Sequence, residues 1–148
     1  MSLEIIISDA IKDAMRAKDK VALDALRAVK SQILLLKTEA KGADVSADQE
    51  IAILQRMIKQ RKDSYDQFVA QNRSDLAEVE AAQTKVIEKY LPKQLSAEEL
   101  ESEIKKIIAD TGAESAKDLG KVMGMARKNL AGKSDGKSIS EMAKKLLS

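Results

Sequence analysis

The chain has 148 residues and a net charge of +2, with 34% charged and only 2% aromatic side chains. Cysteine and histidine are both absent, which excludes disulfides, zinc sites built on thiolate or imidazole ligands, and Cys–His or Ser–His–Asp catalysis. A single proline, six glycines and many straight-chain side chains favour long helices over sheet.

Apolar residues three and four positions apart predict four helices before the single proline. Gly42 ends the second helix because glycine readily adopts a left-handed conformation. Ser46 and Gln49 form a capping box that opens the third helix. The predicted helices end near Lys18, Gly42, Asn72 and Tyr90. The inward-facing stripes predicted for the last two helices are Ile51, Leu54, Ile58, Tyr65 and Phe68, and Leu76, Val79, Val86 and Tyr90.

Pro92 marks the predicted domain boundary. Proline disfavours a helical residue before it and cannot continue the fourth helix. Ser96 and Glu99 directly after it form a second capping box. We therefore expect an N-terminal helical bundle over residues 1–92 and a separate C-terminal domain over residues 93–148. The alternative is a simple interhelical turn within one bundle.

Three shorter helices are predicted after the boundary. The first runs from Ser96 to about Asp110 and ends at Gly112, and the second covers about residues 117–130. The third opens at Ser138, which forms a third capping box with Glu141. The predicted fold class is all-α, with about four helices in the N-terminal bundle and a small three-helix C-terminal domain.

The stretch from Gly120 to Lys137 holds four of the six glycines and five cations against one acid, so it is the first candidate contact surface. Two Gly-Lys-Ser sequences in it resemble the end of a phosphate-binding P-loop. That motif needs a glycine five positions earlier, where this chain has Arg127 and Ala131, and it needs a preceding strand. We reject both matches.

The cations of this region form the best candidate for binding an anion such as RNA. The helix beginning at Ser138 would add outward-pointing N–H groups and a positive dipole end. The alternative is an ordinary solvated face. The candidate RNA-binding residues are Lys117, Lys121, Arg127, Lys128, Lys133 and Lys137.

Gly120 and Gly124 lie four residues apart inside a helical pattern. Each interior glycine costs about 1 kcal/mol relative to alanine, so a compensating contact is expected. One interpretation is close packing of a neighbouring helix. The other is a backbone surface left open for a phosphate or a partner chain.

The three aromatic residues limit how RNA could be recognised. Tyr65, Phe68 and Tyr90 have the spacing of core residues, which leaves no platform for stacking bases. Recognition would then depend on RNA backbone and shape, and would suit a folded RNA better than a single strand.

Several segments in order along the chain resemble the YqeY family. They are residues 14–20, 26–27, 58–64, 90–95, 111–112, 117–124 and 135–137. The family is similar to the tail domain of the B subunit of the glutamine-dependent aspartyl/glutamyl-tRNA amidotransferase. The resemblance implies a helical bundle followed by a three-helix domain, and a relationship to an element that engages tRNA beside a separate catalytic body.

We therefore predict a non-catalytic module that binds tRNA or assists an amidotransferase-type system. The alternatives are a protein-interaction module that docks on a translation component, and a carbon–nitrogen ligase with glutamine as amido-N-donor, the activity that family labels imply. We expect no catalytic residues, cofactor or metal. The N-terminus has no basic signal-peptide region, and no apolar stretch approaches the length of a membrane span, so we expect a cytoplasmic protein.

Overall fold

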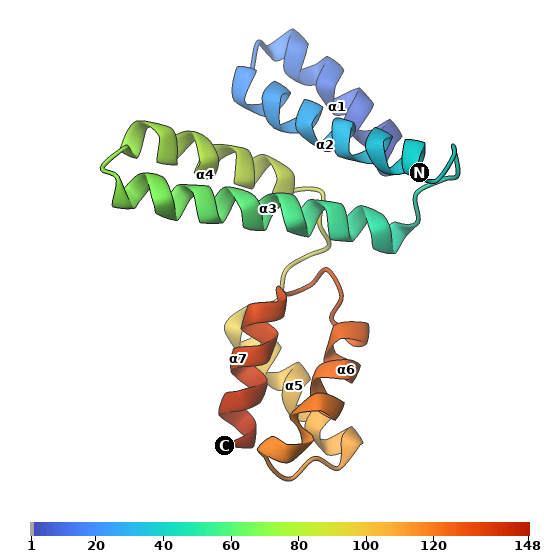
Figure 1. Ribbon diagram of the computed structural model, residues 1–148, viewed down its shortest axis with the longest axis vertical. Helices are drawn as coiled ribbons and strands as arrows, with labels where there is room; N and C mark the ends of the chain where they lie inside the picture. Colours follow the sequence, from blue (N-terminus) through green and yellow to red (C-terminus); the bar gives the residue numbers. More distant parts are fainter. Residues whose placement is uncertain (1) are drawn as a thin grey trace. The chain divides into compact units, whose positions relative to one another are not determined.

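The computed structural model describes residues 2–148, and every regular element within that span is a helix. The all-helical fold predicted from the sequence is confirmed. The chain divides into two compact units, one ending at Leu91 and the other beginning at Pro92 (Figure 1). None of the described helices is both long and apolar enough to cross a membrane.

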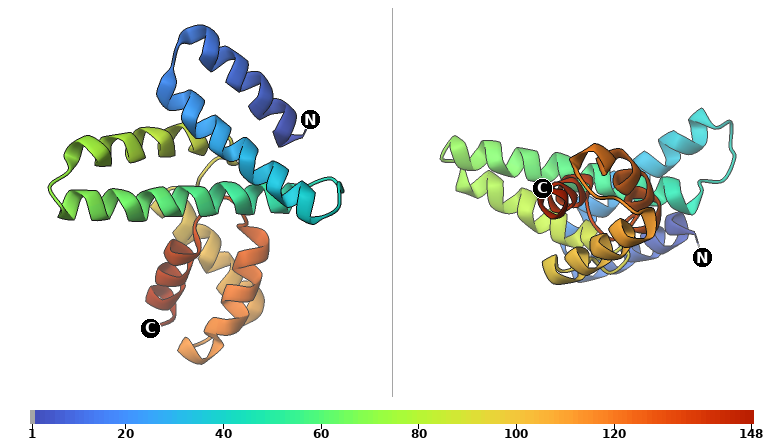
Figure 2. Two further views of the ribbon diagram at one scale, coloured as in Figure 1. Left: turned by 45° about the horizontal axis from the view of Figure 1, so that its top comes forward. Right: turned by 90° about the horizontal axis from the view of Figure 1, so that it is seen from below.

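The N-terminal unit consists of two helical hairpins (Figures 1 and 2). Within its described residues the helices are α1 Leu3–Ala17, α2 Lys20–Glu39, α3 Ala47–Ala70 and α4 Ser74–Glu88. The α1–α2 hairpin packs against the longer α3–α4 hairpin, and α2 contacts both α3 and α4. The four helices match those predicted from apolar spacing, with small differences at their ends.

An aliphatic core joins these two hairpins. Ile7 of α1, Val29 of α2, Leu54 of α3 and Ile87 of α4 are all fully buried. An ion pair ties α1 to α2 at the edge of this core, where Glu4 Oε2 lies 2.8 Å from Lys37 Nζ. The Glu4 carboxylate raises the pKa of Lys37 through this hydrogen bond and its charge.

The inward-facing positions predicted for α3 and α4 are wrong at two residues. Tyr65 is 39% exposed and Val79 is 43% exposed. Along α3 no described residue after Ile58 is buried, and Phe68 is only half-buried. Apolar residues therefore recur at helical spacing along α3 beyond Ile58, the last residue of the helix that is buried in the core. Periodicity alone overestimates the buried length of α3.

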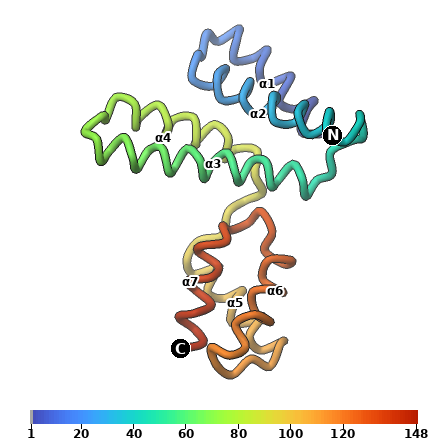
Figure 3. The backbone as a smooth tube through the Cα atoms, viewed as in Figure 1, coloured from blue at the N-terminus to red at the C-terminus, as the bar shows by residue number. Residues whose placement is uncertain are grey.

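The C-terminal unit contains α5 Ala97–Thr111, the short 3₁₀ helix η1 Ala116–Asp118, α6 Leu119–Asn129 and α7 Gly136–Leu147. The backbone trace in Figure 3 shows α5, α6 and α7 gathered around one centre. Its buried core includes Ile104 of α5, Val122 of α6 and Ala143 of α7. The backbone N–H of Leu95 donates to the carbonyl oxygen of Lys133 at 2.8 Å, which holds the start of this unit against the α6–α7 loop.

Two of the three predicted capping boxes are confirmed. Ser46 caps α3 with Gln49, and Ser96 caps α5 with Glu99, in both cases with reciprocal hydrogen bonds. The third is wrong: α7 begins at Gly136, and Asp135 Oδ1 accepts from the Ser138 N–H at 2.7 Å. Aspartate is as good an N-cap as serine, so the cap formed three residues earlier than predicted.

We expect Ile104→Ala to destabilise the C-terminal unit selectively. Ile104 is fully buried, and its truncation leaves a cavity that lowers the free energy of unfolding by about 2–5 kcal/mol. Urea denaturation followed by circular dichroism measures the loss. The two cores share no buried residue, so Leu54→Ala should instead weaken the N-terminal unit. A single transition shifted equally by both variants would contradict independent cores.

Candidate nucleic-acid interface

Two buried residues fix the rotation of α6 about its axis. Val122 and Ala126 are one turn apart and are completely inaccessible to solvent. An α-helix has about 3.6 residues per turn, so the side opposite this pair carries Gly120, Gly124 and Lys128. All three of these residues are exposed. Packing of α6 in the core therefore determines which residues face solvent.

The solvent-exposed side of α6 carries cations as well as the two glycines, which have no side chains. Lys121, Arg127 and Lys128 are exposed, and α6 itself contains no acidic residue. The sequence has no acid between Asp118 and Asp135. None of the ion pairs formed among residues 2–148 includes these three cations. We call Gly120, Lys121, Gly124, Arg127 and Lys128 the α6 face.

The glycines of the α6 face have no packing role within the described chain. A Cβ atom placed on Gly120 or Gly124 would meet no heavy atom of residues 2–148 within 4 Å, apart from the local helix backbone. Close packing of a neighbouring helix, one of the two interpretations predicted from sequence, therefore does not explain why glycine occupies these two positions. Neither glycine has a positive φ, so backbone geometry does not require glycine either.

The other predicted cations lie on separate segments. Lys117 lies in η1, Lys133 lies in the α6–α7 loop, and Lys137 is the second residue of α7, and all are exposed. The anion site predicted at the start of α7 already holds the Asp135 carboxylate, which accepts the Ser138 N–H. Only the three cations of α6 are thus arranged by one rigid helix.

Asp118 modifies the electrostatics at the N-terminal end of the α6 face. Its carboxylate accepts a hydrogen bond from the Glu114 N–H at 3.0 Å, and this bond is the main reason why the pKa of Asp118 is lowered. The positive charge of Lys121 contributes to the same shift. Asp118 therefore stays ionised near Lys121, which leaves Arg127 and Lys128 as the less compensated cations.

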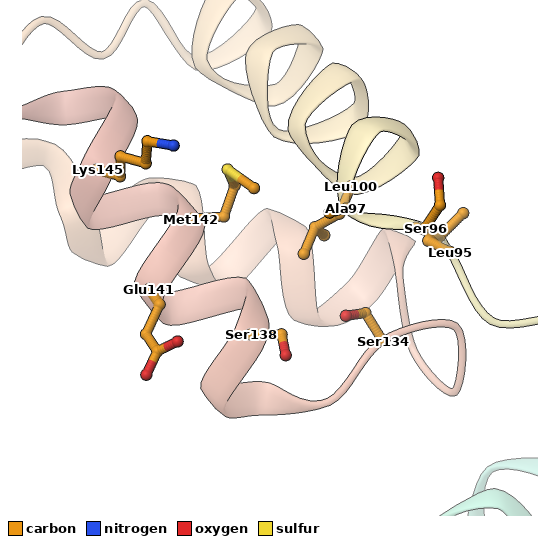
Figure 4. A pocket seen from close by; sticks show the side chains of 9 residues that line it. All are labelled: Leu95, Ser96, Ala97, Leu100, Ser134, Ser138, Glu141, Met142 and Lys145. Carbon is orange, nitrogen blue, oxygen red and sulfur yellow. The ribbon is translucent and has the colours of Figure 1, made fainter.

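A cavity of about 390 Å³ lies elsewhere in the C-terminal unit, between the start of α5 and α7 (Figure 4). Leu95, Leu100 and Met142 supply apolar lining, and Glu141 and Lys145 lie one turn apart on α7. Those two charged side chains form no ion pair with each other. Sequence reasoning missed this cavity because its walls come from segments about forty residues apart.

The chemistry available at the α6 face is the binding of anions. Guanidinium and ammonium groups on a bare helix surface donate charge-assisted hydrogen bonds to phosphate oxygens, and the missing side chains let a ligand approach the backbone closely. Among residues 2–148, no three acidic side chains gather into a group that could hold a metal ion.

A family model described as Yqey-like protein matches residues 5–147. The chain belongs to the YqeY-like family. Similar curated relatives are named "Altered inheritance of mitochondria protein 41, mitochondrial". That of Kluyveromyces lactis is 35% identical over 103 residues, which cover 68% of this chain and 55% of the relative. That of Pyrenophora tritici-repentis is 30% identical over 125 residues, covering 83% and 68%. The chain spans about half the length of several relatives it matches.

The geometry predicts that Gly120→Ala/Gly124→Ala stabilises the C-terminal unit. Both sites are helical, exposed and open, so alanine removes the glycine penalty of up to about 1 kcal/mol at each site without a clash. Thermal and urea unfolding should both shift towards higher stability. Gly112→Ala is the contrasting control, because Gly112 has φ +70° and should lose stability. Destabilisation by the double alanine variant would show that α6 is packed against something.

Proposed function

We propose that this YqeY-like chain is a non-catalytic helical module that binds tRNA, or assists a tRNA-dependent amidotransferase-type system, through the α6 face. The observation that carries the proposal is the pairing of exposed cations with bare backbone on one rigid helix. Arg127, Lys128 and Lys121 would contact phosphates, while Gly120 and Gly124 let the RNA backbone approach α6.

The resemblance of the family to the amidotransferase tail domain supports this choice of ligand. The resemblance implies that this domain engages tRNA beside a separate catalytic body, and the family match covers residues 5–147 of this chain. The sequence predicts a cytoplasmic protein, whereas the similar relatives are named mitochondrial. The proposal holds for either compartment, because tRNA is present in both.

Charge reversal at the α6 face should collapse tRNA binding. We expect Arg127→Glu/Lys128→Glu to weaken the affinity for total tRNA by about a hundredfold, on the order of tenfold for each charge-assisted hydrogen bond removed. The slope of log affinity against log salt should fall by about 2 in magnitude, because each phosphate neutralised by a cation contributes about one unit. Filter binding across a salt series measures both quantities.

The matched control is Lys144→Glu/Lys145→Glu. It reverses two adjacent exposed cations in the last turn of α7, just as the test variant does in the last turn of α6. Net charge and helix-dipole effects are therefore the same in both variants. Unchanged tRNA affinity in the α6 variant, or equal weakening in both variants, would refute the assignment of binding to the α6 face.

The cavity between α5 and α7 favours a second candidate function, docking on a protein of the translation apparatus. Its apolar lining could accept an aliphatic side chain, and Glu141 and Lys145 could meet opposite charges on the partner. These two residues are exposed and form no ion pair within the described chain. This surface differs from the α6 face, so the two functions are separable.

Ala97→Glu tests the docking function. Ala97 is an exposed cavity residue at the first position of α5, where an acidic side chain is compatible with the helix dipole. If the cavity binds a protein, capture by the wild-type chain from nuclease-treated extract in high salt should disappear in this variant. The α6 charge-reversal variant should keep that capture. If the Ala97→Glu variant still captures the same protein, the cavity is not the docking surface.

A further inference from the structure

We propose that the α6 face binds a double-helical, A-form segment of RNA and reads its shape rather than its base sequence. This inference rests on the proposed function and names the part of the RNA that is contacted. It follows from three features of the described C-terminal unit: its lack of aromatic side chains, the spacing of the α6 cations, and the absence of side chains at the two glycines between them.

The C-terminal unit has no aromatic group on which unpaired bases could stack. The aromatic residues Tyr65, Phe68 and Tyr90 all precede Pro92, so none belongs to this unit. Recognition of single-stranded RNA relies on aromatic or guanidinium platforms for splayed bases. Arg127 is the only arginine in residues 92–148. A single strand bound at this surface would therefore gain charge attraction but little stabilisation from base stacking.

The backbone positions that carry the cations of α6 are held at a fixed spacing. Lys121 and Lys128 are seven residues apart, which corresponds to about 10.5 Å along the helix axis. Arg127 lies on the other side of the two glycines, at the opposite edge of the α6 face. Cations that extend from fixed backbone positions favour a ligand whose phosphates are already fixed, as they are in a duplex, over a flexible strand that must be ordered on binding.

The groove geometry of RNA agrees with this surface. The major groove of A-form RNA is too deep and narrow for side chains to read, whereas the minor groove is wide and shallow and displays 2′-hydroxyls between rows of phosphates. A helix face whose middle carries only hydrogen atoms at Gly120 and Gly124 can lie close to riboses, with cations reaching phosphates on either side. Such contacts do not distinguish base sequence.

Binding of the full chain to defined nucleic acids tests this inference. The probes are two blunt RNA duplexes of unrelated sequence, longer than the about 16 base pairs that a known duplex-binding fold spans. A DNA duplex and an unstructured RNA strand of the same length complete the set. We expect the two RNA duplexes to bind within about threefold of each other, and the strand and the DNA to bind at least about tenfold more weakly. Arg127→Glu/Lys128→Glu should abolish duplex binding, and Lys144→Glu/Lys145→Glu should not.

Two failures are distinguishable. If tRNA binds in an α6-dependent manner but the duplexes do not, or if one duplex sequence binds far more tightly, duplex recognition is wrong while the proposed function stands. Equal affinity for DNA and RNA duplexes would reduce the interaction to general charge attraction and would likewise overturn the inference. If neither tRNA nor any duplex binds, the proposed function itself is wrong.

Discussion

Burial of one side of α6 is the constraint on which the candidate interface depends. Val122 and Ala126 must face α5 and α7 for the small C-terminal core to close, and both are fully buried. That requirement leaves no freedom in where the remaining residues of α6 point. Arg127 and Lys128 directly follow a core residue in sequence, and they are placed in solvent by the same rotation that buries Ala126.

The helices and their ends could largely be predicted from sequence, because they are set by local chemistry. Ser46 with Gln49 and Ser96 with Glu99 cap helices through hydrogen bonds that span only three residues. Tyr65 shows where this reasoning stops: its helical period is correct, but only α4 packs beside that end of α3, and burial of Tyr65 would need a further helix there. The start of α7 was mispredicted for a different reason, since Asp135 and Ser138 both have the chemistry of a cap and only one can be used.

The candidate interface at the α6 face likewise has features that sequence predicts and features that only the folded chain determines. The cations of residues 117–137 are evident from sequence, and the seven-residue spacing of Lys121 and Lys128 already places these two on one helix face. The structure shows that this face and Arg127 are exposed and that the predicted anion site at α7 holds the Asp135 carboxylate. The structure changes the interpretation of Gly120 and Gly124 most. Sequence alone left packing and an open backbone as alternatives. A Cβ atom placed at either glycine would meet no atom of residues 2–148 within 4 Å beyond the local helix, which favours the open backbone.

Charge separation within the C-terminal unit explains how a nearly neutral chain can present a basic surface. Helix α5 carries five acids, Glu98, Glu99, Glu101, Glu103 and Asp110, and both of its lysines pair with acids of the same helix. The cations of α6 have no acid within their own helix. The three phosphate contacts proposed for this face would support only weak binding, because sequence-independent contacts typically give dissociation constants of about 10⁻⁴–10⁻⁶ M at physiological salt. An affinity of that order agrees with the accessory role proposed above, since two linked weak contacts reach high occupancy that neither attains alone.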